Sequence, residues 1–345
     1  MMEIVAVIGV LLALAFIFTN GFQDASSIAA TFIASRSAKP RQGIALVAGM
    51  NLLGALLGGS AVAFTLAGLV LVEPGDTVIV ILLAALTAAI AWNVITWRYG
   101  LPSSSTHALV GGLMGAAVAA EGLGAVQWGW DELISSAHQL TGLVKILLFL
   151  VVSVLVGLAG GYLMHKAGLL ALRNAKAAAN KRIIRVNWAA AAAMGFFNGA
   201  NDAQKQMGMI ALILFGAGLT AELEIELWTR VACAVILAAG TLGGGWRIMR
   251  TLGSKIFRVR PVHSLESQLS SGLSIGISTL AGAPISSTHV ISSSIIGVGA
   301  AATPRAMRWS VGKDILIGFA ITIPITMLIS GLLFLMLSSV LQPGG

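Results

Sequence analysis

Two short amide-rich segments, each with one carboxylate, stand inside otherwise apolar sequence. Their polar residues are Asn20, Gln23 and Asp24 in the first segment, and Asn198, Asn201 and Asp202 in the second. An ionisable side chain at membrane depth is rare and commonly marks an ion or substrate pathway. Carboxylate and amide oxygens are also the hard ligands that small cations take. We therefore expect these residues to hold a cation or a proton. The plainer alternative is a pair of carboxylates hydrogen-bonded to neighbouring helices.

Two runs of hydroxyl side chains follow prolines that interrupt apolar sequence. They comprise Ser104, Ser105 and Thr106 after Pro102, and Ser286, Ser287 and Thr288 after Pro284. A residue before proline is driven out of helical geometry, whereas proline itself suits the first turn of a new helix. Each run is thus predicted to open a half-helix, where free N–H groups and the positive dipole end favour an anion. Two such ends facing each other would hold a tetrahedral oxyanion such as phosphate or sulfate. Ordinary packing of Ser and Thr between membrane helices is the alternative.

Further ionisable residues accompany these motifs. Lys205 follows Asp202 on nearly the same helix face, where it could replace a bound cation, contact the anion or simply pair with Asp202. Glu266 is either a coupling carboxylate or an interfacial residue. His107 and His289, which end the hydroxyl runs, suit a proton relay or a neutral hydrogen bond to a carbonyl.

The composition identifies the class of protein. Of 345 residues, 57% are hydrophobic and 10% are charged, and the mean hydropathy is +0.93. Soluble domains carry about a quarter charged residues, so we expect an all-α polytopic membrane protein in the lipid bilayer. The net charge of +8 lies in short loops between apolar spans, which the positive-inside rule explains better than a nucleic-acid partner. The single cysteine, Cys233, excludes a disulfide framework and a cysteine metal site.

Apolar stretches long enough to span a bilayer fall into two groups of about five. They lie at residues 4–34, 42–72, 77–98, 103–120 and 143–165, and then at 187–219, 228–247, 265–283, 284–303 and 314–341. Most Lys and Arg residues fall in loops 36–41, 166–185, 247–260 and 305–313, which we place in the cytoplasm. If every stretch crosses once, both termini are extracytoplasmic and the second group starts from the opposite side to the first.

The two groups are therefore predicted to be inverted-topology repeats with broken or half helices meeting at the midplane. The paired motifs at Asp24 and Asp202, and at Pro102 and Pro284, support this independently, as do the glycine-rich segments near residues 54 and 240. This is the sequence signature of alternating-access transporters, with substrate bound at the repeat interface. The expected parts are an N-terminal repeat (1–165), a basic cytoplasmic linker (166–186) and a C-terminal repeat (187–345).

With these motifs in view, the chain resembles the inorganic phosphate transporter (PiT) family over essentially its whole length. The second motif, from Asn198 to Gly208, is similar to a bacterial branch in which Asn-Asp-Ala-Gln-Lys is usual. The resemblance implies a secondary transporter of the cell inner membrane that moves phosphate with protons or sodium, with no other cofactor. Some bacterial members carry a neutral metal–phosphate complex, and a homodimer is typical of the family.

The resemblance also assigns residues to roles. It implies that the anion is held by Ser104, Ser105, Thr106, Ser287 and Thr288. It implies that the coupling cation, sodium included, is held by Asp24, Asn201 and Asp202. Glu266 matches a glutamate that family members carry after the second basic loop.

The first motif departs from the family pattern. Gln23 stands where Asn or His is usual, and Ser26-Ser27 replaces Ala-Asn. One cation ligand is therefore missing in the first half, which weakens a sodium site and favours protons. Three alternatives stay open: a sulfate or other oxyanion permease of the same fold, an intramembrane aspartyl protease using Asp24 and Asp202 as a dyad, and an anion channel.

Overall fold

The computed structural model describes residues 2–135, 138–176, 178–244, 249 and 251–341, and these residues are almost entirely helical. The helices are α1 (Met2–Ala34), α2 (Pro40–Leu57), α3 (Ala61–Ala67), α4 (Asp76–Tyr99), α5 (Ser105–Glu121), α6 (Trp130–Ile134), α7 (Gly142–Ala171), α8 (Ala179–Gly216), α9 (Leu227–Gly243), α11 (Pro261–Leu280), α12 (Ser287–Ala302) and α13 (Trp309–Leu341). A π-helical turn, η2 (Thr251–Lys255), precedes α11, and short 3-10 turns lie at Leu123–Ala125 and Pro304–Ala306. In these ranges the extended pairing consists of one isolated bridge, Val70 to Val126.

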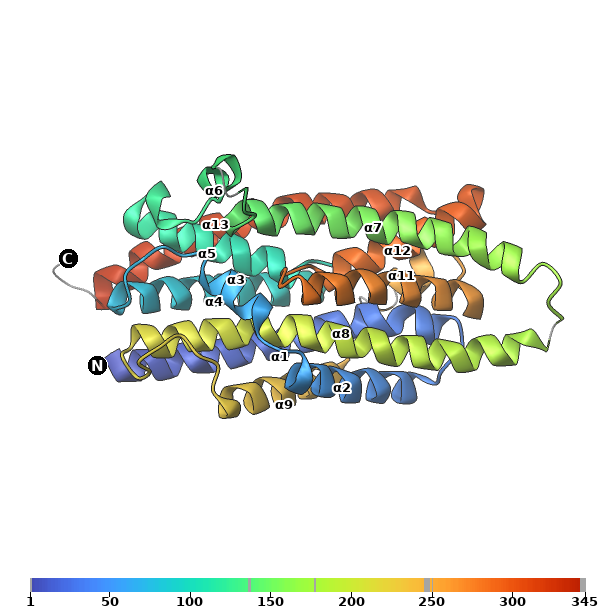
Figure 1. Ribbon diagram of the computed structural model, residues 1–345, viewed down its shortest axis with the longest axis horizontal. Helices are drawn as coiled ribbons and strands as arrows, with labels where there is room; N and C mark the ends of the chain where they lie inside the picture. The colour runs from blue at the N-terminus through green and yellow to red at the C-terminus, as the bar shows by residue number, and fades with distance from the viewer. Residues whose placement is uncertain (1, 136–137, 177, 245–248, 250, 342–345) are drawn as a thin grey trace.

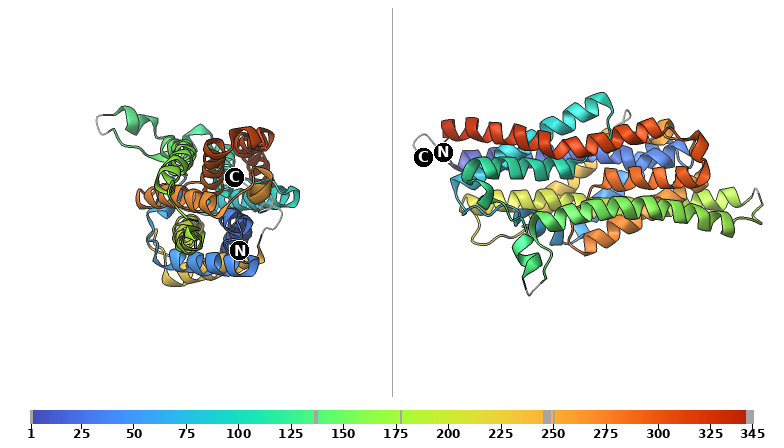
Figure 2. Two further views of the ribbon diagram at one scale, coloured as in Figure 1. Left: turned by 90° about the vertical axis from the view of Figure 1, so that its right-hand side faces the viewer. Right: turned by 90° about the horizontal axis from the view of Figure 1, so that it is seen from above.

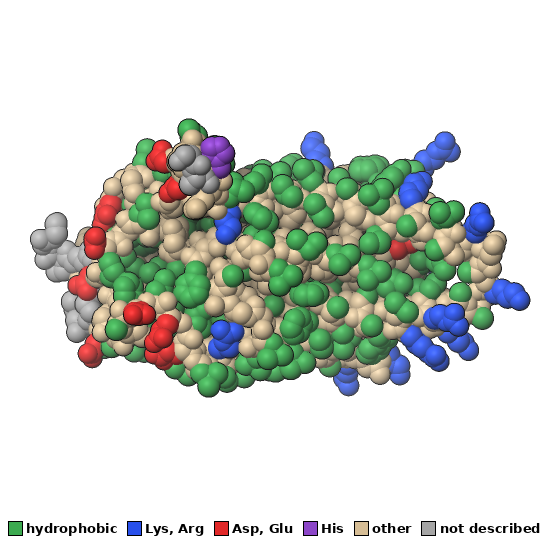
Figure 3. Space-filling model, in the orientation of Figure 1, with side chains coloured by type: hydrophobic (Ala, Val, Ile, Leu, Met, Phe, Trp, Pro, Cys, Tyr) green, Lys and Arg blue, Asp and Glu red, His purple; other side chains and the backbone are tan. Residues whose placement is uncertain are grey.

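The helices run along one long axis, and α1 begins at the same end of the molecule as α13 ends (Figure 1). Asp and Glu side chains gather at that end, Lys and Arg gather at the other, and a hydrophobic belt lies between them (Figure 3). Arg247 and Arg250 of the third basic loop lie outside the described residues.

Four described helices are long and apolar enough to cross a membrane. Helices α2 and α3, which are bent by 76° at the break between them, would together make a fifth span. The expected all-α polytopic membrane protein is confirmed.

Two helix pairs form hairpins. In Figure 1, α4 and α5 lie together in one half of the length and α11 and α12 lie together in the other, and each pair is packed together. Gly100 and Gly282, with φ of 67° and 64°, end α4 and α11 in the left-handed conformation that glycine adopts without strain. The chain then turns back near the middle of the bundle. These four segments thus pair as two hairpins, an arrangement that hydropathy had left open, and the expected half-helices are confirmed.

The two halves interlock. In Figure 1, α8 runs antiparallel to α1, and it starts at the end where α1 finishes. The first hairpin packs through α5 on α13, and the second packs through α12 on α7; likewise α2 packs on α8, and α9 on α1 (Figures 1 and 2). Each packing thus joins an element of one repeat to an element of the other.

Glycines let the two motif helices approach their partners closely. A Cβ atom on Gly199 of α8 would overlap the backbone of Asn51 in α2, and one on Gly240 of α9 would overlap the backbone of Phe18 in α1. Small residues at such crossings allow backbone contact between membrane helices. These contacts fix the depth at which Asp24 and Asp202 lie.

Candidate functional site

The tips of the two hairpins are capped alike. Ser104 and Ser286 have extended backbones, and their hydroxyls accept hydrogen bonds from the backbone N–H of His107 (3.0 Å) and His289 (3.3 Å). These are N-cap bonds, so the half-helices begin at the next residue, and the prolines stand before the cap. The first turn thus starts later than the sequence indicated. Ser105 and Ser287 open the two helices, each followed by the threonine.

Both motif carboxylates reach the tip of the second hairpin. Thr288 donates its hydroxyl proton to Asp24 Oδ1 at 2.6 Å. Ser287 Oγ lies 3.3 Å from Asp24 Oδ2 and 3.2 Å from Asp202 Oδ2, so one hydroxyl bridges the two acids. Asp24 and Asp202 are 2% and 0% exposed. The structure therefore brings the two matched acids together in a dry interior.

Lys205 joins the tips of both hairpins. Its ammonium group donates to Asp202 Oδ1 (2.5 Å), to Thr106 Oγ1 (2.7 Å) and to the carbonyl of Ile285 (2.8 Å). Thr106 in turn donates to the same carbonyl at 2.7 Å. All three ammonium protons are used, and the side chain is 1% exposed. Of the alternatives read from the sequence, Lys205 makes the ion pair with Asp202 and also contacts a hydroxyl of the expected anion cage.

The amide side chains next to the two acids hydrogen-bond to the helices that lead into the hairpin tips. Asn201 donates to Thr279 Oγ1 (3.0 Å) and to the Ala283 carbonyl (3.1 Å), and it accepts from the Ile285 N–H (3.4 Å). Its counterpart Gln23 donates to Thr96 Oγ1 at 3.2 Å, at the end of α4. Both side chains therefore bind the helix that leads into a hairpin tip.

The outer amides differ from each other. Asn198 donates to Asn51 Oδ1 at 3.3 Å and so faces α2. Asn20, one helical turn before Asp24, is fully buried, and neither its Oδ1 nor its Nδ2 has a hydrogen-bond partner among the described residues. A buried amide without a partner costs free energy. Asn20 is thus available to a ligand beside Asp24.

The rings of the two motif histidines contact each other in a tilted arrangement where the half-helices begin. Their rings lie 4.3 Å apart between centroids at an interplanar angle of 44°, and His107 Nδ1 lies 2.7 Å from Ser104 Oγ. This contact, with the bond from Thr106 to Ile285, places the two tips directly against each other.

Glu266 lies outside this cluster. Its carboxylate bonds His165 Nδ1 at 2.8 Å, about 20 Å along α11 from the end of that helix at Leu280. His263 packs edge-on against His165, with centroids 5.4 Å apart. Neither histidine carried a motif signal in the sequence, since their partners come from distant parts of the chain.

Other contacts also escaped the sequence. Thr96, Thr279 and the carbonyl of Ile285 bind motif side chains, yet isolated threonines and backbone carbonyls have no recognisable pattern. Among the described residues, no group of three or more His, Cys, Asp or Glu side chains is placed to hold a metal ion.

The chain matches known proteins over almost its full length. A model of the phosphate transporter family matches residues 20–184 and again 170–330. A protein of Bacillus subtilis strain 168, named probable low-affinity inorganic phosphate transporter, is 38% identical over 343 residues, covering 98% of each chain. A protein of the same name from Rhizobium meliloti strain 1021 is 36% identical over 324 residues, covering 93% of each.

A solved structure titled "The sodium-dependent phosphate transporter" shares the fold. Its TM-score is 0.77 at 23% sequence identity, over 97% of this chain and 99% of that one. With the two matches of the family model, this likeness supports the two repeats expected from the paired motifs.

Proposed function

Because the chain belongs to the phosphate transporter family, as its paired motifs implied, we propose that it imports inorganic phosphate with a coupling cation by alternating access. The family is one of transporters, so the aspartyl protease interpretation of Asp24 and Asp202 is set aside. The observation that carries the proposal is the convergence of hydroxyl groups from both hairpins with the Lys205 ammonium group of α8 at one buried point.

The proposed anion ligands are the donors at that point. Thr106, Ser287, Thr288 and the Lys205 ammonium group are linked by bonds of 2.5 to 3.3 Å to one another, to the Ile285 carbonyl or to the two acids. Charge-assisted donors in a dry interior suit phosphate oxygens. Ser105 lies in the adjacent first turn, while Ser104 and Ser286 cap the half-helices and thereby orient their N–H groups.

A proton shared by the acids would complete their hydrogen bonding. The Ser287 hydroxyl carries one proton and can donate to one carboxylate, yet it contacts both Asp24 and Asp202. The second contact needs a proton on the other acid. Lys205 balances one negative charge, and a second buried charge without a partner is costly. We assign the coupling proton to this pair, with Asp24 as the acid that lacks a fixed cation.

The same bonds suggest how proton and anion are coupled. While Asp24 is ionised, it holds the hydroxyl protons of Thr288 and Ser287. When it is protonated, those hydroxyls are free to turn toward phosphate. Lys205 and Thr106 would join them by releasing the Ile285 carbonyl to which both now donate. The anion cage is therefore strong when the proton is bound and weak when it is not, which makes transport of each depend on the other.

Sodium is the other cation to consider, since the structural relative is titled sodium-dependent. The side chain of Asn201 is occupied by the second hairpin, and Lys205 already neutralises Asp202. Among the described residues, Asn20 has both amide atoms unpartnered, and Gln23 Oε1 and Asn198 Oδ1 are each unpartnered as well. These contacts favour a proton over a sodium ion held by Asp24, Asn201 and Asp202.

The packing of the site supports alternating access. The cluster side chains are at most 3% exposed, so access from either end requires one hairpin tip to leave the other. Each hairpin is packed on a helix of the opposite repeat, so the proposed movement displaces one hairpin together with the helix that carries it. The positive-inside rule puts the basic end in the cytoplasm and both termini outside.

Other assignments rest on the family resemblance. The division of the repeats at linker 166–186 is proposed from the basic composition of that stretch, whereas a metal–phosphate complex as cargo and a homodimer follow from the resemblance alone. Glu266 with His165 would act near the cytoplasmic end, apart from the anion.

The test is uptake by proteoliposomes containing the purified protein, with labelled phosphate and, separately, labelled sulfate. Inward proton and sodium gradients are imposed one at a time, with a valinomycin-clamped membrane potential. We expect saturable phosphate uptake driven by the proton gradient. Sulfate uptake equal to that of phosphate would show that phosphate is not the specific substrate. Uptake driven by the sodium gradient alone would show that sodium, not the proton, is the coupling ion. Non-saturating flux without ion coupling would indicate a channel and contradict the proposal.

A further inference from the structure

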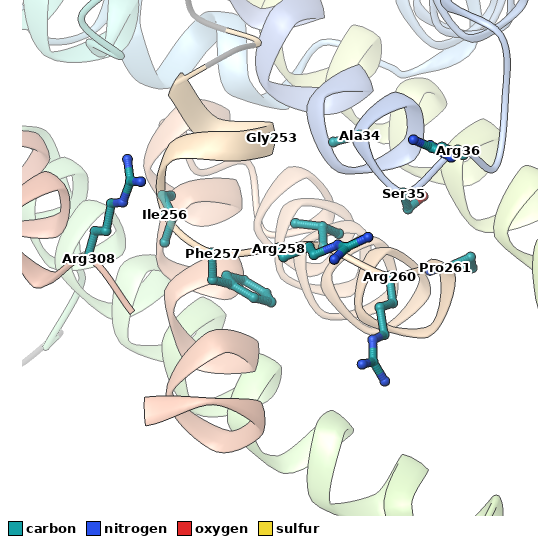
Figure 4. Close-up of a pocket in the computed structure, with 11 residues that line it drawn as sticks. Ala34, Ser35, Arg36, Gly253, Ile256, Phe257, Arg258, Arg260, Pro261 and Arg308 are labelled. Carbon is teal, nitrogen blue, oxygen red and sulfur yellow. The ribbon is translucent and has the colours of Figure 1, made fainter. Parts of the chain in front are cut away.

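A separate cavity of about 730 Å³ lies at the basic end of the molecule (Figure 4). Its walls come from three places: Ser35 and Arg36 after α1, the segment 256–261 that leads into α11, and Arg308 just before α13. Cavities of this size hold ligands considerably larger than a single phosphate ion. It is distinct from the buried acid cluster at the hairpin tips.

The charge of this cavity is one-sided. Its lining includes four arginines and no acidic residue: Arg36, Arg258, Arg260 and Arg308. Among the described residues, the acidic groups in ion pairs are Glu266 and Asp202, which bond His165 and Lys205 rather than these arginines. Figure 4 shows the guanidinium group of Arg258 directed toward Arg36, from the opposite side of the cavity. Like charges brought together repel, and an anion between them converts that repulsion into attraction.

The backbone conformation of Arg36 indicates that its side chain has a role at this position. Arg36 has a φ of 60°, and it closes α1 by donating its N–H to the Ile33 carbonyl at 2.9 Å. Glycine or asparagine is usual in this left-handed position, and an arginine there carries a backbone cost. On the other wall, α11 begins at Pro261, so the positive end of its dipole also faces this region.

We propose that this cavity binds a soluble polyphosphate anion, such as a triphosphate chain, from the solution at the basic end. Planar guanidinium forks match phosphate oxygens in pairs. Ala34, Ile256 and Val259 supply apolar wall for any non-phosphate part of the ligand. The four arginines stand on segments between helices rather than on the long apolar helices, so the proposal commits to a ligand from solution rather than to a lipid.

The bound anion would connect the two repeats. Arg36 ends the helix that carries Asp24, and Arg258 and Arg260 precede the helix that leads into the second hairpin. A ligand held by both would stabilise the present arrangement of α1 and α11, raising the thermal unfolding temperature as ligand concentration rises.

The experiment is calorimetric titration of the purified full-length protein with sodium tripolyphosphate, using sulfate as a single-anion comparison. Arg36→Gly removes one guanidinium and relieves the backbone cost, and Arg258→Ala removes the facing one. The control is the double variant Arg173→Ala with Lys181→Ala, which removes two exposed charges from the linker at the same end. We expect saturable binding that is weakened about tenfold or more by each cavity variant, and less than twofold by the control.

Three results would overturn the proposal. They are absence of saturable tripolyphosphate binding, an equal loss in the linker control, and saturable binding of phosphatidic acid in nanodiscs without binding of tripolyphosphate. Arg36→Gly decides the matter if Arg258→Ala fails to fold. Phosphate uptake by each variant is measured separately, so failure of this proposal does not depend on the transport proposal.

Discussion

The two motif helices give equivalent residues unequal settings. On α8, Asp202 is followed one turn later by Lys205, whereas on α1 the residue one turn after Asp24 is Ser27. Both later residues reach the hairpin of the other repeat: Lys205 donates to Thr106 at 2.7 Å, and Ser27 donates to Thr288 at 3.5 Å. The two motif helices thus make equivalent contacts with the opposite hairpin, but only α8 carries a basic residue at this position.

This difference indicates which of the two acids can gain or lose a cation. Asp202 has a permanent cation attached to its own helix. Asp24 is surrounded by hydroxyls, and a carboxylate buried in this way needs a mobile positive charge. We infer that one repeat supplies a fixed charge for anion binding and the other supplies the position at which the coupling ion enters and leaves.

The largest effect is expected from Asp24→Asn, which imitates the protonated acid permanently. Net phosphate uptake driven by a proton gradient should fall about 100-fold or more, since the proton can no longer be released. Exchange of internal for external phosphate should persist within about tenfold, because the anion cage stays formed. Both are measured in the same proteoliposomes. Loss of exchange together with net uptake would show that Asp24 is needed for the anion or the fold instead.

Lys205→Met should have the next largest effect. Removing the ammonium group leaves Asp202 buried without its cation, which costs about 3 to 5 kcal/mol in comparable pairs. Uptake and exchange should both be lost, and the thermal unfolding temperature should fall. The double variant Lys205→Met with Asp202→Asn should recover the unfolding temperature but not phosphate binding. If the double variant transports normally, the fixed charge has no role in anion binding.

A matched pair, Thr106→Val and Thr288→Val, separates the two sides of the site. Each removes one hydroxyl from the proposed cage, and each should raise the KM for phosphate about tenfold, the usual scale for one hydrogen bond to a charged group. Thr288 also bonds Asp24, so its variant alone should change the external pH at which uptake is half-maximal. An equal change of pH profile in both variants would contradict the division of roles.

The smallest effect is expected from Gln23→Asn, which makes the first motif resemble the second. The shorter side chain loses the bond to Thr96, which is worth about 1 kcal/mol for neutral groups. Uptake should therefore drop about two- to fivefold, without loss of proton coupling. Initial rates at saturating and limiting phosphate give the comparison. A gain of sodium-driven uptake would show that Gln23, rather than Lys205, decides the coupling ion.

Much of the fold could be predicted because it depends on local sequence patterns. The breaks at Pro102 and Pro284, the hydroxyl runs and the matched acids together predicted paired half-helices in two inverted repeats. Hydropathy, however, cannot distinguish a full crossing from half of a hairpin, so the number of crossings could not be predicted from it. The exact helix starts depended on Ser104 and Ser286 acting as caps, although proline before them suggested an earlier start.

The candidate site was predictable in its members but less so in its contacts. Asp24, Asp202, Ser287 and Thr288 come together as expected, since each lies in a repeated motif. The choice among the alternatives for Lys205 needed the position of Thr106, which is far away in sequence. The separation of Glu266 from the cluster depends on its bond to His165, a partner that no local pattern indicates.

The central claim is that the two hairpin tips form one phosphate site beside Asp24. The most direct measurement is a density map of the protein prepared with phosphate at a pH that protonates the site. We predict tetrahedral density within hydrogen-bond distance of Thr106, Ser287, Thr288 and Lys205. Phosphate density elsewhere, with the bonds of Thr288 and Ser287 to Asp24 unchanged, would contradict the account.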